Sequence, residues 1–235
     1  MKIGLIGAME IELAHLISDM EAHRVERVLG VEFHLGTIGG VEVVLAKCGI
    51  GKVAAAVTAQ TMILTYRPQL LINTGVGGSL TTRLSVGDIA ISLRAVEHDM
   101  DTSPLGDPVG FLSGINRIYL DADRESAERL ASCADALGLK AVLGTVCSGD
   151  RFVASMAEKE RIASLFEDAA VCEMEGAAIA HTAYLASVPF VIVRAISDSA
   201  DGSSSMDYME FLPLAAERSY ALVRAYLEGL RKVNR

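Results

Sequence analysis

Patterns of buried strand and of helix alternate along the whole of this chain of 235 residues. The clearest strand is Val188–Ile196, a largely apolar run of the kind that lies in a parallel sheet with both faces covered. Helical patterns separate it from the strands predicted at Lys2–Ile6 and Leu70–Asn73. Such alternation favours a sheet with helices on both sides. We therefore predict one α/β domain over residues 1–235, built as a three-layer α/β/α sandwich.

The central sheet is predicted to be mixed, because a hairpin pattern around Gly39-Gly40 interrupts the alternation. The hairpin strands and two later ones are Glu32–Ile38, Val41–Lys47, Asp88–Ser92 and Val142–Cys147. The predicted helices are Glu10–His23, Gly51–Tyr66, Arg124–Leu137, a short one opened by the capping box Ser155–Glu158, Glu173–Ala186, and a C-terminal amphipathic helix with Pro213 near its start. No helix or strand is predicted in Glu97–Gly114, and loops of this length are usually functional.

Charge, hydropathy and cysteine spacing narrow the class of protein. The formal net charge is −9 and no more than two basic residues are adjacent, which argues against a nucleic-acid partner. No apolar run approaches the ~20 residues of a membrane-spanning helix, so no membrane partner is expected. The four cysteines lack Cys-x-x-Cys spacing and the chain has no signal-peptide pattern. We therefore expect reduced thiols and a cytoplasmic location.

The motifs that would indicate a cofactor or a metal are incomplete. Gly75–Leu80 is similar to a dinucleotide-binding loop, but Leu80 stands where that fingerprint requires glycine or alanine. The glycines at 49 and 51 are similar to a phosphate loop that lacks its first glycine and its final hydroxyl residue. The five histidines have no metal-ligand spacing. We expect neither a cofactor nor a metal.

Three carboxylates lie at positions where an α/β fold builds its sites. Asp198 follows the carboxyl end of the strand Val188–Ile196, where ligand crevices form in such sheets. Glu175 lies at the predicted start of a helix, where free N–H groups favour an anion. Glu12 follows the first strand. Each residue alone also suits a cap or a solvated helix face, but together they indicate one pocket that receives three carboxylates.

Five separated motifs place these residues in a wider pattern. In chain order they are Gly7–Glu10, Asn73–Gly78, Ser148–Phe152, Val171–Gly176 and Arg194–Asp198. This ordered set resembles the 5′-methylthioadenosine/S-adenosylhomocysteine nucleosidases of the purine nucleoside phosphorylase/hydrolase superfamily. The resemblance runs from Met1 to the last helix, and it implies the nucleoside phosphorylase-like fold.

The resemblance also implies a role for each matching residue. Glu12 matches the base that deprotonates the attacking water, Asp198 the acid that protonates adenine N7, and Ser197 a residue that positions this acid. Glu175 matches the carboxylate on the ribose hydroxyls, and Arg194 a residue that supports Glu12. The other implied substrate contacts are Met9, Ile50 and Tyr208 around the 5′-thio group, Phe152 and Val153 on adenine, Met174 against the sugar, and Gly78.

The implied activity is hydrolysis of an N-glycosidic bond in an adenosyl nucleoside. Such a bond breaks through an oxocarbenium-like sugar, so acid, base and sugar-binding carboxylates each have a use. The resemblance further implies a homodimer in which the loop Glu97–Gly114, with Leu105, completes the partner's site. Two alternatives stay open: a phosphorolytic purine nucleoside phosphorylase, and a nucleoside-binding protein without activity on the same fold.

Overall fold

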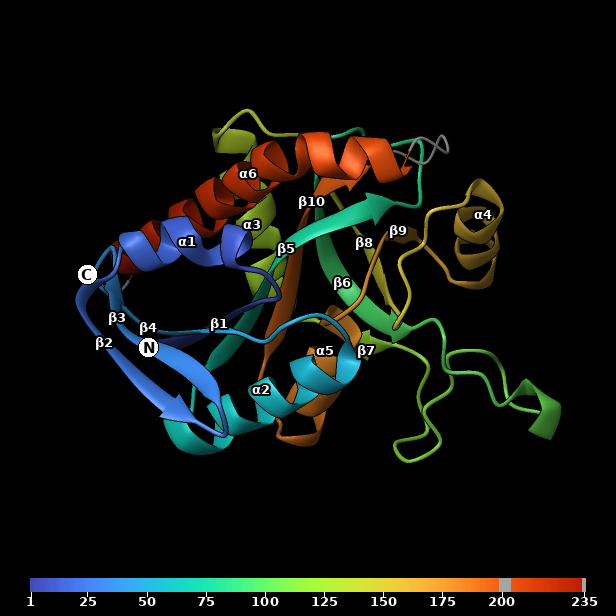
Figure 1. Cartoon of the computed structure of the whole chain (residues 1–235), viewed down its shortest axis with the longest axis horizontal. Helices are drawn as coiled ribbons and strands as arrows, with labels where there is room; N and C mark the ends of the chain where they lie inside the picture. The colour runs from blue at the N-terminus through green and yellow to red at the C-terminus, as the bar shows by residue number, and fades with distance from the viewer. Residues whose placement is uncertain (199–203, 234–235) are drawn as a thin grey trace.

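The computed structural model describes residues 1–198 and 204–233. Within them, ten strands form one mixed sheet that helices cover on two sides (Figure 1). The strands are β1 (Lys2–Gly7), β2 (Glu21–Val28), β3 (Val31–Ile38), β4 (Val41–Lys47), β5 (Leu70–Ser79), β6 (Ile89–Glu97), β7 (Leu120–Asp121), β8 (Ala141–Ser148), β9 (Ala169–Glu173) and β10 (Phe190–Asp198). The helices are α1 (Glu10–Ser18), α2 (Lys52–Tyr66), η1 (Ser103–Leu105), α3 (Arg124–Ala136), α4 (Met156–Leu165), α5 (Gly176–Leu185) and α6 (Ser204–Val233).

The sheet closes on itself at one end. Its strand order is β10-β6-β8-β9-β5-β1-β4-β3-β2, and β10 also pairs with β5, in parallel. Strands β5, β9, β8, β6 and β10 therefore form a ring, and β1, β4, β3 and β2 extend from β5 as an open sheet. The predicted α/β fold with a central mixed sheet is confirmed. The closed ring is an additional feature that the sequence analysis did not anticipate.

Alternation along the strands divides the apolar core into two layers. In β10, Val191 and Val193 belong to one buried cluster, whereas Phe190 and Ile192 belong to the other. Successive side chains of a strand point to opposite faces, so each strand supplies both layers. Helices α1 and α3 contact α6 over one face, and α2 contacts α5 over the other. This arrangement is the predicted three-layer sandwich.

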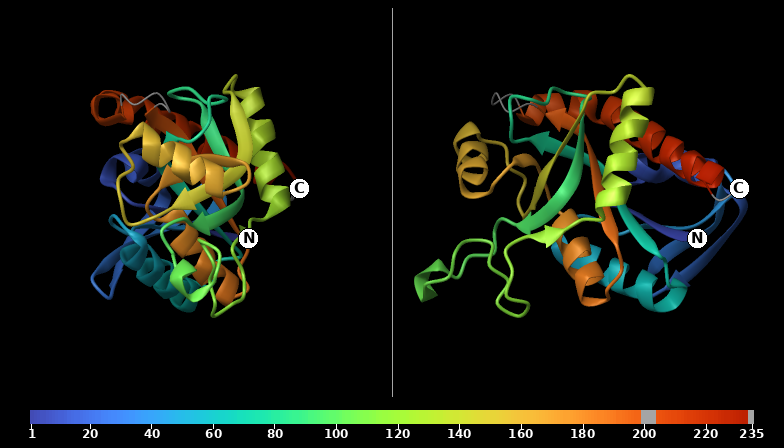
Figure 2. Two further views of the ribbon diagram at one scale, coloured as in Figure 1. Left: turned by 90° about the vertical axis from the view of Figure 1, so that its right-hand side faces the viewer. Right: turned by 180° about the vertical axis from the view of Figure 1, so that it is seen from behind.

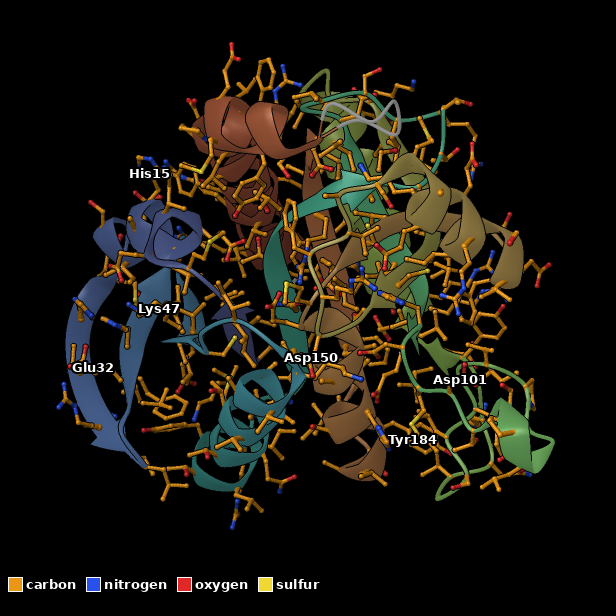
Figure 3. All side chains as sticks on the ribbon, turned by 45° about the vertical axis from the view of Figure 1, so that its right-hand side comes forward. His15, Glu32, Lys47, Asp101, Asp150 and Tyr184 are labelled. Carbon is orange, nitrogen blue, oxygen red and sulfur yellow. The ribbon has the colours of Figure 1, made fainter. Side chains whose placement is uncertain are left out.

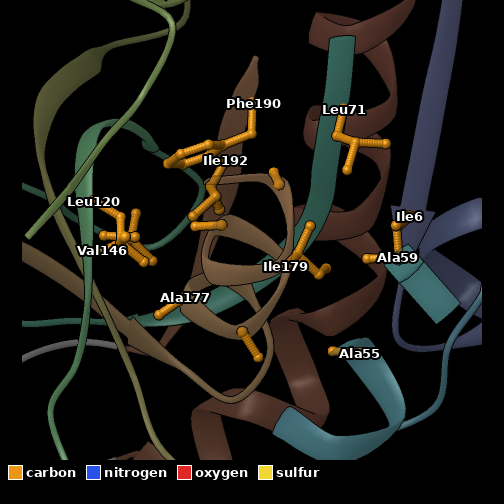
Figure 4. Close-up of a cluster of buried hydrophobic side chains, with 14 of the residues drawn as sticks. Ile6, Ala55, Ala59, Leu71, Leu120, Val146, Ala177, Ile179, Phe190 and Ile192 are labelled. Atoms are coloured by element: carbon orange, nitrogen blue, oxygen red, sulfur yellow. The ribbon is translucent and has the colours of Figure 1, made fainter. Parts of the chain in front are cut away.

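Small residues let α2 and α5 approach each other and the sheet closely. Figure 4 shows Ala55 and Ala59 of α2 near Ile179 of α5, with Phe190 and Ile192 of β10 on the sheet side. All five side chains are buried. Because an alanine fills little space, the helix axes can lie close to the strands, and this fixes where the start of α5 meets the pocket described below.

The structure corrects three predicted elements. Helix α1 ends at Ser18 rather than at His23, and residues 21–28 form the edge strand β2. Glu173 ends strand β9 instead of opening the next helix, which begins at Gly176. The last helix spans Ser204–Val233 with Pro213 inside it, whereas we placed this proline near the start of a shorter helix.

The segment between β6 and β7 projects away from the body of the molecule (Figures 1 and 2). It carries the short helix η1, and Leu105 at the end of η1 is 83% exposed. An apolar side chain this exposed on an extended segment contributes nothing to the core of its own chain.

Candidate active site

A cavity of ≈ 290 Å³ opens where β1, β5 and β10 end. These three strands run parallel, so their carboxyl ends meet at one edge. Nearly all of the residues that the sequence analysis assigned to a site line this cavity: Met9, Glu12, Ile50, Gly78, Phe152, Val153, Met174, Glu175, Ser197, Asp198 and Tyr208. The predicted convergence of three carboxylates is therefore observed. Arg194 and Leu105 lie elsewhere.

Glu12 is held at the N-terminus of α1 by backbone donors. Its Oε2 accepts hydrogen bonds from Ala8 N at 2.8 Å and Met9 N at 2.9 Å, and its Oε1 accepts one from Val76 N at 3.1 Å. Burial raises the pKa of Glu12, although the nearby Arg194 charge and these N–H groups oppose the rise. A buried carboxylate with a raised pKa is suited to accept a proton from a neutral nucleophile such as water.

Glu175 occupies the N-cap position of α5, and its side chain reaches across to the start of α2. Its Oε1 accepts a hydrogen bond from Gly51 N at 2.8 Å. Gly51 has φ of +97°, a conformation that favours glycine and that directs its N–H toward this carboxylate. Burial, followed by the neighbouring Glu173 charge, raises the pKa of Glu175 to about 7.

A buried ion pair lies beneath Glu175. Arg194 of β10 donates hydrogen bonds to the Glu173 carboxylate and to the side-chain oxygen of Asn73. Glu173 also accepts bonds from Glu175 N at 3.1 Å and from Ser148 Oγ. We expected Arg194 to support Glu12; its hydrogen bonds instead hold Glu173, and it acts on Glu12 through its charge, which lowers the Glu12 pKa.

Asp198 ends β10 and binds an ammonium group from α4. Lys159 Nζ lies 2.7 Å from Asp198 Oδ2, and both side chains are almost fully buried, with exposed fractions of 2% and 3%. Ser197 Oγ donates a hydrogen bond to Asp198 Oδ1 at 3.1 Å. Gly78 leaves room for this carboxylate, because a Cβ there would lie 2.8 Å from Asp198 Oδ2.

The opposite wall of the cavity is apolar and partly open. The rings of Phe152 and Tyr208 meet edge to face, with centroids 5.4 Å apart. Tyr208 donates its hydroxyl to Met9 Sδ at 3.4 Å. Ile50 is 62% exposed and Phe152 is 47% exposed, so the described residues of the chain leave this wall partly uncovered. The cavity can thus hold a polar group at the carboxylates and an apolar group beside Met9.

Loop contacts fix the rim of the cavity next to Phe152. Asp150 Oδ1 accepts a hydrogen bond from Lys52 N at 2.7 Å, and Asp150 N donates to Asp99 at 2.8 Å. Figure 3 shows Asp150 beside the start of α2, and Asp101 farther out on the projecting segment. Across the described ranges 1–198 and 204–233, no group of three or more His, Cys, Asp or Glu side chains could hold a metal ion.

Sequence reasoning missed two parts of the site. Glu173 was taken as a helix-opening charge, but its place at the end of the buried strand β9 indicates a partner such as Arg194. Lys159 lies between Glu158 and Glu160 in a short helix, which is the pattern of a solvated face. Lys159 is nevertheless buried and contacts Asp198 at the end of β10, 39 residues away, which no local pattern reveals.

Comparison with known proteins identifies the family of this chain. A model of the phosphorylase superfamily matches residues 2–228. A curated 5′-methylthioadenosine/S-adenosylhomocysteine nucleosidase from Shewanella pealeana is 37% identical over 230 residues, which cover 98% of this chain and 100% of the relative. The chain belongs to this nucleosidase family of the phosphorylase superfamily.

Solved structures agree with this assignment. The nucleosidase of Neisseria meningitidis, in complex with methylthio-immucillin-A, has a TM-score of 0.93 at 34% identity over 97% of this chain and 99% of that one. A futalosine hydrolase of Helicobacter pylori has a TM-score of 0.89 at 31% identity, over 97% of both chains. The nucleosidase fold thus carries at least two named hydrolase activities, and the residues of the cavity must select between substrates.

Proposed function

We propose that this protein hydrolyses the N-glycosidic bond of 5′-methylthioadenosine and S-adenosylhomocysteine, and also of 5′-deoxyadenosine. The products are adenine and the corresponding ribose. The observation that carries the proposal is the convergence of Glu12, Glu175 and Asp198 on one cavity with an apolar wall. The whole-chain relationship to nucleosidases supports it.

Each carboxylate has a separate task in this reaction. Asp198 provides the proton that makes adenine N7 positive and adenine a good leaving group. Glu175 binds the ribose hydroxyls and stabilises the positive charge that develops on the sugar. Glu12 takes a proton from the water that attacks the sugar. Ser197 positions Asp198, and Arg194 holds Glu173 beneath the sugar-binding carboxylate.

The remaining lining residues contact three different parts of the substrate. Phe152 offers a ring face to adenine, the Val153 backbone reads its polar edge, and Gly78 leaves space beside it. Met174 lies against the ribose. The apolar wall of Met9, Ile50 and Tyr208 receives the 5′-thio substituent. A thioether fits this wall because it forms only weak hydrogen bonds.

Hydrolysis is favoured over phosphorolysis by the charge at the water site. A phosphorylase binds phosphate where the attacking nucleophile lies, and the Glu12 carboxylate there would repel it. The test is incubation with methylthioadenosine in phosphate-free buffer containing a chelator, with chromatography for adenine. Adenine and free methylthioribose are expected. A ribose 1-phosphate that forms only with added phosphate would show phosphorolysis, and binding without either product would identify a nucleoside-binding protein.

We also propose that the active form is a cytoplasmic homodimer, on the following grounds. Leu105 is 83% exposed on a projecting segment (Figure 2), while Ile50 on the apolar wall is 62% exposed among the described residues. A second copy would supply the cover if its segment carried Leu105 onto this wall. For the cytoplasm, the supporting observation is that all four cysteines are free thiols. Across the described ranges, no helix meets the length and hydropathy of a membrane span.

A further inference from the structure

The contact between Lys159 and Asp198 raises the question of which of these two groups holds the proton that is transferred to the purine. A carboxylic acid that protonates N7 must itself carry a proton, yet Asp198 lies 2.7 Å from an ammonium group. Protonation of Asp198 beside a charged Lys159 would remove the negative charge that faces this buried ammonium, which is costly. A carboxylate beside an ammonium is neutral as a pair and satisfies both groups. In this geometry either group of the pair can hold the transferable proton.

We infer that Lys159 is a positioning residue that supplies, through Asp198, the proton received by the purine. The inference rests on the proposed function. Lys159 is not among the residues that line the cavity, so it reaches the substrate only through Asp198. Its exposed fraction of 2% also keeps it from exchanging protons freely with solvent during the reaction. The Lys–Asp pair thus acts as an internal proton source.

The proton reaches the purine in two transfers. An N–H bond of the Lys159 ammonium breaks as an O–H bond forms on Asp198, and this O–H bond breaks as N7 of the purine gains the proton. The electrons of the glycosidic bond then pass to the purine, which leaves as neutral adenine. Water attacks the sugar and gives its proton to Glu12. Lys159 is left as a neutral amine, and release of product to solvent lets Glu12 lose a proton and Lys159 regain one.

Within the part of the chain that the structure describes, Cys172 and Tyr208 lie near the pair and do not carry this proton. Burial raises the pKa of Cys172 to about 12, and burial also raises the pKa of Tyr208, so both groups are neutral near pH 7. Glu12 and Glu175 titrate in the same cavity, and their titration is common to every variant of Lys159. The ratio of variant to wild-type turnover, measured at each pH, therefore isolates the contribution of Lys159.

The test compares Lys159→Met in two backgrounds, wild type and Asp198→Asn. In the wild-type background, Asp198 must take its proton from solvent, so the turnover ratio should fall as the pH rises and reach a loss of about 10²-fold. In the Asp198→Asn background, Lys159→Met should change single-turnover rates by less than threefold. Lys159→Arg keeps the charge but a guanidinium does not give up its proton, so it should not restore turnover.

Control measurements separate an effect on folding from an effect on the reaction. Lys159→Met leaves the Asp198 carboxylate buried without the Lys159 ammonium, whereas the double variant removes both charges. The double variant should therefore have a higher melting temperature than Lys159→Met alone. Lys140→Met, at an exposed lysine 3.6 Å from Asp88, should behave as wild type. A loss that is independent of pH, equal in both backgrounds, or rescued by arginine would overturn the inference. Failure of the wild-type protein to release adenine would contradict the proposed function itself, and the inference with it.

Discussion

Glu12 and Val76 lie 64 residues apart in the chain and are joined by a hydrogen bond of 3.1 Å from the Val76 amide to Glu12 Oε1. The bond ties the first turn of α1 to strand β5. It orients the carboxylate toward the cavity while Ala8 and Met9 hold the other oxygen. Three backbone donors, two from the turn before α1 and one from β5, fix this side chain more firmly than one flexible partner would.

Glu12→Gln should abolish turnover and preserve binding. The amide is almost the same size as the carboxylate but cannot accept a proton from water. Calorimetry with methylthioadenosine should still give a binding isotherm for the folded variant, whereas the adenine assay should give no signal above background. Loss of binding together with turnover would assign Glu12 to holding the ligand instead.

Gly75→Ala should inactivate the enzyme through Glu12. An added Cβ would lie 2.4 Å from Glu12 Oε1, so the flexible carboxylate must move away. We expect a turnover loss of at least tenfold with a small change in melting temperature. The matched control is Gly229→Ala in α6, where nothing lies within 4 Å and alanine favours the helix by about 0.5–1 kcal/mol. If Gly75→Ala kept full activity, the placement of Glu12 would not matter for the reaction.

Asp198→Asn should lower turnover by at least ~10⁴-fold, the top of the range for acid–base groups, because adenine leaves poorly without protonation. Circular dichroism should show an unchanged fold. Retention of more than about a tenth of wild-type turnover would place the acid on a different residue.

Glu175→Gln should stabilise the protein in alkaline solution. Burial raises the pKa of Glu175 to about 7 from an ordinary value of 4.5. Between these values the unfolded chain loses the proton while the folded chain keeps it, so wild-type stability falls as pH rises through this window. The variant lacks this titration and should gain on the order of 3 kcal/mol at pH 8, and nothing at pH 4. Denaturant titrations at both pH values measure the difference, and an equal effect at the two pH values would contradict the assigned titration.

Leu105→Asp should act on the 5′ substituent and not on the ribose. If a partner's Leu105 covers the apolar wall, the new charge should raise the Michaelis constant for methylthioadenosine at least tenfold more than that for adenosine. Sedimentation at micromolar concentration should show a dimer for the wild-type protein. A fully active monomer would exclude the proposed arrangement.

The sequence predicted the elements whose apolar pattern repeats with a clear period. Strand β10 and helix α2 were both found, as was the cavity at the strand ends. Strand β2 was missed because its residues are exposed, so it lacks an apolar face to alternate. Strand β9 was missed because five buried residues, two of them alanine, run directly into the next helix.

The candidate site could be predicted where one residue follows a strand or opens a helix. Asp198 and Glu175 met this condition, and both line the cavity. Lys159 did not, because its neighbours are charged and its partner lies 39 residues away. Sequence patterns report which face of an element is apolar, and they do not report which distant group a buried charge meets.

The two halves of the sheet should differ in how readily their backbone hydrogen bonds open. One half is the closed ring of β5, β9, β8, β6 and β10, and the other half ends at the free edge of β2. Every ring strand has hydrogen-bonded neighbours on both sides, whereas β2 borders only β3 and carries mostly charged and polar residues along its free edge. Amide hydrogens of β10 should therefore exchange with deuterium only through global unfolding, while those of β2 exchange through local fraying. Because β2 is exposed and far along the sheet from β10 and β9, substitutions that loosen β2 should lower thermal stability and leave the chemistry at Asp198 and Glu173 intact.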